Sequence, residues 1–243
     1  MAITPDPAVV AELAPSGVLR AGINLSNFLL VTGRAANGDP QGIAPDMAGE
    51  IAARLEVPLQ LIPYESPGKL ADAVAEWDVG LIGAEPARAA QIAFSAAYLE
   101  IEATYLVPAG SKIRSVEEVD REGVRIAVAA RSAYDLYLSR TIKHAELVHA
   151  AGLDASYDLF VRDKLDALAG LRPRLLRDIE KLPGARVLEG RFTAVQQAVG
   201  TPKGRVASAT FLAALVEEAK ASGLVARLIE RHRVDGVNVA PRV

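Results

Sequence analysis

Strand and helix signals alternate along the first third of the chain. Three short apolar runs have the length of buried strands: residues 18–23, 58–62 and 79–82. Two helical segments separate these runs: residues 45–55, with Met47, Ile51 and Leu55 on one face, and residues 69–77. Alternation of this kind predicts a parallel sheet covered by helices.

The rest of the chain continues the pattern and predicts two lobes. Strands at 101–107 and 193–200 are expected to cross between them. The other segments expected are helices at 5–13, 132–142, 158–164, 174–181, 206–221 and 224–232, strands at 28–31, 124–129, 146–149, 165–169 and 186–188, and turns at 37–40 and 201–204. We therefore assign residues 1–106 and 197–243 to lobe 1 and residues 107–196 to lobe 2.

Composition excludes several classes of protein. The 243 residues carry a net charge of -3 without a basic run, which argues against a nucleic-acid partner. Cysteine is absent, which removes disulfides, thiolate nucleophiles and cysteine-ligated metals. No apolar run approaches the roughly 20 residues that span a bilayer, so direct membrane insertion is not expected.

The first 17 residues lack the pattern of a secretion signal, which leaves two locations open. The protein is periplasmic if a signal was trimmed and cytoplasmic if the chain is complete.

The stretch from Trp77 to Ser95 carries the first functional hypothesis. Its apolar run ends in Gly83 and Ala84, Pro86 suits a first helical position, and Arg88 follows in the first turn. A helix N-terminus presents backbone N–H groups that bind anions, and an arginine beside it grips a carboxylate bidentately. The alternative is a plain turn with a solvated arginine.

Ordered motifs resemble those of the type II periplasmic solute-binding proteins of family 3, which serve ABC importers of amino acids and related small solutes. The segments that carry the resemblance are LRAGIN at 19–24, GIAPDM at 42–47, DV at 78–79, EPAR at 85–88, IAFS at 92–95 with Tyr98, LVPAGS at 106–111, 124–134 and LDA at 165–167. The resemblance implies two α/β lobes, each with a mainly parallel sheet flanked by helices, joined by two hinge strands. A small-molecule ligand is then held in the cleft between the lobes, and a membrane component of an ABC importer is the expected partner.

The resemblance also implies a set of ligand-binding residues. Arg88 aligns with the arginine that clasps the ligand carboxylate, although the stretch from Asp78 is two residues shorter than in amino-acid binders. The full set is Asn24, Asn27, Phe28, Ser66, Gly83, Ala84, Glu85, Arg88, Arg131, Ser132, Ala133, Tyr134 and Arg172. Structural roles compete at several of these positions, with Phe28 as a core residue, Ser132 as a helix cap only, and Glu85 as a partner of Arg88. Of Gln196 and Gln197, at most one faces the cleft.

Charge at these positions favours an anionic ligand. Asn24 and either Leu171 or Arg172 stand where amino-acid binders of the family carry aspartates, so the anchors for a ligand ammonium are missing. The candidate residues include three cations, Arg88, Arg131 and Arg172, and one clear acid, Glu85. Burying a ligand ammonium without a carboxylate beside it costs free energy. We therefore expect a carboxylic or dicarboxylic acid rather than a basic amino acid.

Two other functions remain open. Cyclohexadienyl dehydratases resemble these binders and use a carboxylic acid for proton transfer, for which Glu85 is the one candidate. A cytoplasmic sensor or scavenger with the same fold is the second alternative. No cofactor or metal is expected, because His144, His149 and His232 lack metal-ligand spacing and no phosphate-binding loop or dinucleotide motif is present.

Overall fold

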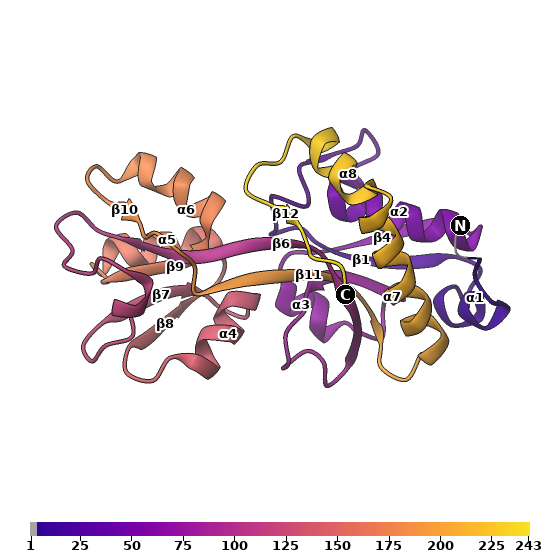
Figure 1. The fold of residues 1–243 in the computed structure, drawn as a ribbon, viewed down its shortest axis with the longest axis horizontal. Helices are drawn as coiled ribbons and strands as arrows, with labels where there is room; N and C mark the ends of the chain where they lie inside the picture. The colour runs from indigo at the N-terminus through magenta and orange to yellow at the C-terminus, as the bar shows by residue number, and fades with distance from the viewer. Residues whose placement is uncertain (1–3) are drawn as a thin grey trace. The chain divides into compact units, whose positions relative to one another are not determined.

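The computed structural model describes residues 4–243, which form two compact units (Figure 1). Unit 1 comprises the chain up to Glu100 together with Gln196–Val243, and unit 2 comprises Ile101–Val195. Strands β6 (Ile92–Val107) and β11 (Thr193–Pro202) each contain a boundary between the units. The α/β class expected from the alternation is confirmed. Among the described residues, no helix is both long and apolar enough to cross a membrane.

Unit 1 is built on three parallel strands. Strand β1 (Leu19–Asn24) pairs in parallel with β4 (Leu59–Tyr64) and with β5 (Val79–Gly83), and β11 pairs antiparallel with β5. The other elements of the unit are α1 (Pro7–Leu13), β2 (Gly33–Arg34), β3 (Pro40–Gln41), α2 (Ile43–Leu55), α3 (Pro67–Asp72), α7 (Val206–Ala221), α8 (Leu224–His232) and β12 (Asn238–Val239). Helix α1 packs on α7, and α2 packs on α8 (Figure 1).

Local sequence explains where several of these elements begin and end. The Asp6 side chain accepts from the Ala8 N–H at 2.8 Å and caps α1, whose first residue is a proline. Helix α2 buries the apolar face that its spacing predicts. Gly223 separates α7 from α8 in a left-handed conformation that glycine adopts without cost.

Trp77 forms the centre of a small apolar cluster in unit 1. Its side chain is fully buried, and its indole N–H donates to the Leu70 carbonyl at 2.9 Å. A Cβ added at Gly22 or Gly80 would lie 3.1 or 3.0 Å from the indole ring. These two glycines therefore leave the space that the ring occupies.

Unit 2 repeats the parallel arrangement with a different set of elements. Strand β7 (Arg125–Ala129) pairs in parallel with β8 (Glu146–Ala150) and with β9 (Ala167–Leu171), and β6 pairs antiparallel with β9. The remaining elements are η1 (Val116–Glu118), α4 (Ala133–Thr141), α5 (Leu153–Arg162), α6 (Arg172–Asp178), η2 (Ile179–Lys181) and β10 (Arg186–Val187). The core of the unit contains Leu106, Phe160, Leu168 and Leu175.

Several segments differ from the sequence-based expectation, and β6 begins at Ile92 rather than at residue 101. Residues 28–31 form a turn rather than a strand, because the N–H groups of Leu30 and Val31 both donate to the Asn27 carbonyl. The helix expected at 69–77 begins earlier and ends earlier, at Pro67–Asp72, because Ser66 caps it and Trp77 turns into the core. The helix expected at 158–164 begins at Leu153, next to Gly152.

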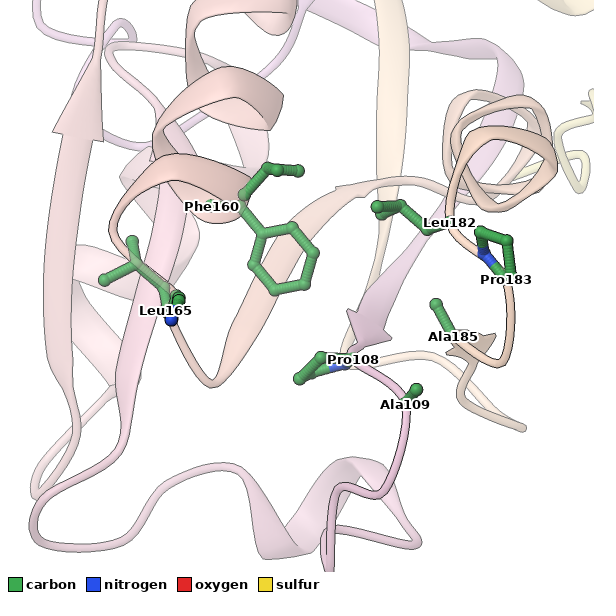
Figure 2. Close-up of a pocket in the computed structure, with 9 residues that line it drawn as sticks. Pro108, Ala109, Phe160, Leu165, Leu182, Pro183 and Ala185 are labelled. Atoms are coloured by element: carbon green, nitrogen blue, oxygen red, sulfur yellow. The ribbon is translucent and has the colours of Figure 1, made fainter.

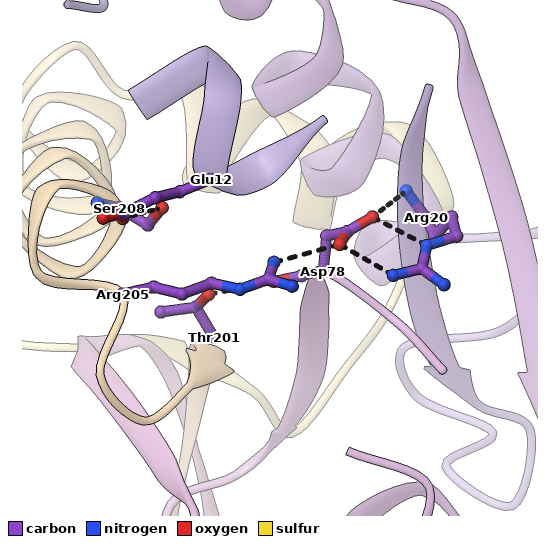
Figure 3. A network of polar contacts seen from close by, with 6 residues as sticks. All are labelled: Glu12, Arg20, Asp78, Thr201, Arg205 and Ser208. Carbon is purple, nitrogen blue, oxygen red and sulfur yellow. Dashed lines mark hydrogen bonds and ion pairs between the residues drawn. The ribbon is translucent and has the colours of Figure 1, made fainter. Parts of the chain in front are cut away.

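A buried carboxylate joins three separate parts of unit 1 (Figure 3). The Asp78 side chain is fully buried and accepts from Arg20 Nε and Nη2 and from Arg205 Nη1, each at 2.9 Å. Its backbone carbonyl accepts from Thr201 Oγ1 at 3.0 Å. Burial raises the pKa of Asp78, but the hydrogen bonds from Arg20 and Arg205 outweigh burial and hold that pKa below its ordinary value.

We expect Asp78→Asn to lower the free energy of unfolding by about 3 kcal/mol at pH 7, because it leaves two arginines without their buried counter-charge. Stability of the natural chain should also fall as pH decreases below about 4. The unfolded state takes up the Asp78 proton first, since the pKa of this carboxyl is lower in the folded state. The variant should lose less stability over that range. Urea unfolding followed by circular dichroism measures both effects.

Asp163→Asn is the matched control, because Asp163 pairs with Arg162 on the surface at 2.7 Å. This variant should unfold like the natural chain at pH 7. If Asp78→Asn behaved in the same way as Asp163→Asn, the buried network would have no role in stability.

Candidate functional site

The segment between β5 and β6 is a series of turns, not a helix. The Arg88 and Ala89 N–H groups donate to the Glu85 carbonyl, and the Gln91 and Ile92 N–H groups donate to the Arg88 carbonyl. The chain enters β6 at Ile92, so the segment is too short for a continued helical ladder. The predicted helix at Pro86, and the anion-binding N-terminus derived from it, are therefore wrong.

Arg88 is nevertheless held inside this turn. It is 7% exposed, and its Nη1 donates to the Gly83 carbonyl at 2.6 Å. Glu85 is 9% exposed. The alternative of a solvated arginine is wrong, because the turn folds the side chain back over the end of β5.

Backbone groups beside Arg88 already have partners within unit 1. The Gly83 carbonyl accepts from Arg88, and the Ala84 N–H donates to the Gln196 carbonyl at 2.7 Å. The Gln196 side chain donates to Glu100 Oε1 at 3.0 Å, while Gln197 is buried. The family resemblance predicts that the main-chain groups of Gly83 and Ala84 bind the ligand. In the structure the Gly83 carbonyl and the Ala84 N–H instead stabilise the end of β5.

The loop after β1 uses its polar side chains on its own backbone. Asn24 Oδ1 accepts from the Ser26 N–H and hydroxyl, and buried Asn27 accepts from the Leu29 N–H at 3.3 Å. Phe28 is half-buried. Such asparagine turns give the loop a defined shape. Ligand binding by these three residues stays a prediction.

Ser66 and Ser132 both cap helices, a role that the sequence predicts for Ser132 but not for Ser66. Ser66 Oγ accepts from the Lys69 N–H at 3.2 Å, and Ser132 Oγ accepts from the Asp135 N–H at 3.0 Å. Asp135 in turn accepts from the Arg131 N–H at 2.6 Å. A carboxylate of the chain itself therefore already lies at the N-terminus of α4, where the sequence predicts a ligand carboxylate.

The residues around this cap differ in exposure. Arg131 is exposed and lies in the left-handed region at φ 60°, while Ala133 and Tyr134 are buried. Burial raises the pKa of the Tyr134 hydroxyl above its ordinary range. His149 Nε2 lies 2.9 Å from Asp135 Oδ1, so this exposed histidine contacts the residue that completes the cap.

Arg172 has partners that the sequence does not predict. Its Nε donates to Glu102 Oε2 at 2.8 Å, Nη1 donates to the Leu188 carbonyl at 3.3 Å, and Nη2 donates to the Gly190 carbonyl. Glu102 is therefore a second acid, and the count that set Glu85 alone against three arginines is wrong. The charge argument for an anion now depends on Arg88 and Arg131.

Histidine and acidic side chains do not gather in a metal-binding pattern in the part of the chain that the structure describes, where no group of three potential ligands occurs. His232 Nε2 lies 2.9 Å from Asp46 Oδ2, which joins α8 to α2.

Residues 24–234 match the sequence model of the bacterial extracellular solute-binding proteins, family 3. The chain belongs to this family. No curated protein sequence matches the chain significantly.

Solved structures share the fold of this family 3 solute-binding protein. A mutant of the arginine-binding protein ArgBP from T. maritima has a TM-score of 0.73 at 22% identity, covering 93% of this chain and 99% of that one. An ancestral amino-acid-binding protein, AncCDT-1, described as a precursor of cyclohexadienyl dehydratase, has a TM-score of 0.73 at 19% identity, covering 91% and 97%. The cysteine-binding protein from Campylobacter jejuni has a TM-score of 0.73 at 17% identity, covering 92% of each chain.

The partners of three acidic residues of this solute-binding protein were not predicted from the sequence. Asp135 was detectable, because it lies three residues after Ser132 and completes a helix-capping pattern. Asp78 was recognised as a family position, but not as a partner of Arg20 and Arg205. Glu102 lies 70 residues before Arg172, and no local signal joins the two.

We expect Ser132→Ala to lower the free energy of unfolding by about 1 kcal/mol, because the Asp135 N–H loses its cap. Ser132→Thr keeps a hydroxyl and should retain most of the stability. Urea unfolding monitored by circular dichroism compares the two variants. Equal stability of Ser132→Ala and the natural chain would show that the cap contributes nothing.

Proposed function

We propose that the protein captures a small carboxylate-bearing solute for an ABC importer, and that Arg88 binds the carboxylate. The observation that carries this proposal is the placement of Arg88, which is 7% exposed and anchored through Nη1 on the Gly83 carbonyl. A guanidinium presents five N–H donors in a rigid fork that matches a carboxylate. Fixing the fork before the ligand arrives reduces the entropy lost on binding.

Amino acids form the first ligand class to test. Solved structures with the same fold include proteins described as arginine-bound, lysine-complexed, glutamine-bound and cysteine-binding. These ligands share an α-carboxylate, which is the group that an arginine recognises.

Among carboxylate-bearing solutes we propose an anionic one, such as a carboxylic or dicarboxylic acid, rather than a basic amino acid. Asn24 is uncharged, and its amide oxygen accepts from Ser26. An amide oxygen does not neutralise a ligand ammonium. Glu102 offsets the charge of Arg172, so Arg88 and Arg131 are the cations on which the proposal rests. Together with the uncharged Asn24, they favour net negative charge on the solute over net positive charge.

We expect Arg88→Ala to weaken binding by about 100-fold or more, since it removes the charged partner of the solute. Arg88→Lys should weaken binding about tenfold, because an ammonium lacks the bidentate fork. A thermal-shift screen of acidic, neutral and basic amino acids with mono- and dicarboxylic acids identifies the solute. Calorimetry then measures its affinity for each variant.

Arg162→Ala is the matched control, because Arg162 is an exposed arginine of unit 2 that pairs with Asp163. It should bind the solute as the natural chain does, and circular dichroism should show all three variants folded. A screen that finds only basic ligands, or an Arg88→Ala protein with unchanged affinity, would contradict the proposal.

We propose a proton-transfer enzyme as the second candidate, because Glu85 is only 9% exposed and lies in the same turn as Arg88. A buried carboxyl group suits general acid chemistry. Prephenate and arogenate should then lose the ring hydroxyl as water and the ring carboxylate as carbon dioxide to give aromatic products, measured by ultraviolet absorbance. Glu85→Gln should abolish that reaction. Absence of aromatisation with the natural chain would leave solute binding as the function.

A further inference from the structure

Unit 2 contains an apolar cavity of about 260 Å³ (Figure 2). It lies at the end of β6 and beside α5, and its lining includes Pro108, Phe160, Leu165, Leu182, Pro183 and Lys164. In Figure 2 Phe160 and Leu182 lie on opposite sides, and Pro108 closes a third side. None of these residues belongs to the candidate solute site.

Two turned segments hold the walls of this cavity. After α5 the chain folds back, and the Leu165 N–H donates to the Phe160 carbonyl at 3.1 Å. After η2 the Ala185 N–H donates to the Leu182 carbonyl at 3.0 Å. Phe160 and Leu165 are almost fully buried in the core of unit 2, so this side of the cavity is rigid.

Lys164 is the one ionisable residue in the lining. The two acids nearest to it in the sequence have other partners: Asp163 pairs with Arg162 at 2.7 Å, and Asp166 accepts from the Arg125 N–H at 2.9 Å. Within residues 4–243, no carboxylate forms an ion pair with Lys164. The cavity therefore combines apolar walls with one positive charge that is not compensated within the chain.

The backbone of Lys164 is also fixed in an unusual conformation. Its φ is 50°, in the left-handed region that glycine and asparagine occupy most readily. Its carbonyl accepts from Arg125 Nη2 at 3.1 Å, which holds the residue at the end of α5. Glu56, Arg131 and Arg233 have the same kind of backbone conformation.

We propose that this cavity binds a small, mainly apolar monocarboxylate. The ring or branched chain of the ligand lies between Phe160, Leu165 and Leu182, and the carboxylate pairs with Lys164 at the opening. The volume suits this class: a cavity of about 150 Å³ lined by similar side chains binds benzene, and this one is larger, at about 260 Å³. Lys164 is exposed, and its long flexible stem allows the ammonium to reach an anion at the opening.

Titration with phenylacetate, followed by calorimetry and by amide shifts in NMR spectra, tests the proposal. Phenylacetate should bind, and the shifted amides should belong to residues 109, 160–165, 182, 184 and 185. Phenylacetamide has the same ring without the charge, and it should bind at least about fivefold more weakly.

Two variants separate the roles of charge and cavity. Lys164→Asn removes the charge but suits the left-handed backbone, so the variant should stay folded and bind phenylacetate at least about fivefold more weakly. Ala185→Phe fills the cavity and should abolish binding of both compounds, with the fold checked by circular dichroism. Arg88→Ala should leave phenylacetate binding unchanged, which distinguishes this site from the proposed solute site.

Several outcomes would overturn the proposal. They are no binding of phenylacetate at millimolar concentration, equal affinity for the acid and the amide, unchanged binding in a folded Ala185→Phe variant, and loss of binding in Arg88→Ala. The last outcome would assign phenylacetate to the solute site and support carboxylate binding by Arg88, whereas the other three do not bear on Arg88.

Discussion

Unit 1 depends on the ion pairs between Asp78 and two arginines. Asp78 lies just before β5, Arg20 belongs to β1, and Arg205 immediately precedes α7. The Asp78 carboxylate is fully buried, and its desolvation costs free energy. That cost is offset only if the guanidinium groups of Arg20 and Arg205 both donate to it. The same cluster reaches α1 through Glu12, which accepts from the N–H and hydroxyl of Ser208 in the first turn of α7 (Figure 3). These contacts fix the start of β5. The turn that contains Arg88 begins at the opposite end of the same strand, after Gly83.

The candidate site follows from how the chain leaves β5. Gly83 ends the strand, and the turns after it bring Arg88 back to the Gly83 carbonyl. These turns bury the Arg88 side chain, which is 7% exposed. In unit 2, α4 does begin where expected, but Asp135 already lies at its N-terminus. The turn after β5 therefore buries a cation, Arg88. The N-terminus of α4 instead has an anion of the chain itself, Asp135, beside it.

Local patterns were sufficient to predict most elements. The capping side chains of Ser66 and Ser132, the apolar face of α2 and the glycine between α7 and α8 all act through neighbours within a few residues. Local patterns failed at residues 28–31 and at Pro86, where the loop beside a strand end took turn conformations. Both failures lie in the candidate ligand region. The loop at 28–31 is held by bonds to Asn27, and the turn after Pro86 is held in addition by the bond from Arg88 to the end of β5.

The sequence by itself determined the α/β class and the family, because hydrophobic periodicity and ordered motifs are local properties of the chain. It also indicated Arg88 as the residue to examine. Only the tertiary structure decided how charge is distributed: Arg172 meets Glu102 across 70 positions, and Asp78 meets Arg205 across 127. It also decided that a cavity forms beside Lys164. Ion pairs and cavities depend on distances between segments remote in the chain, and no spacing along the sequence encodes those distances.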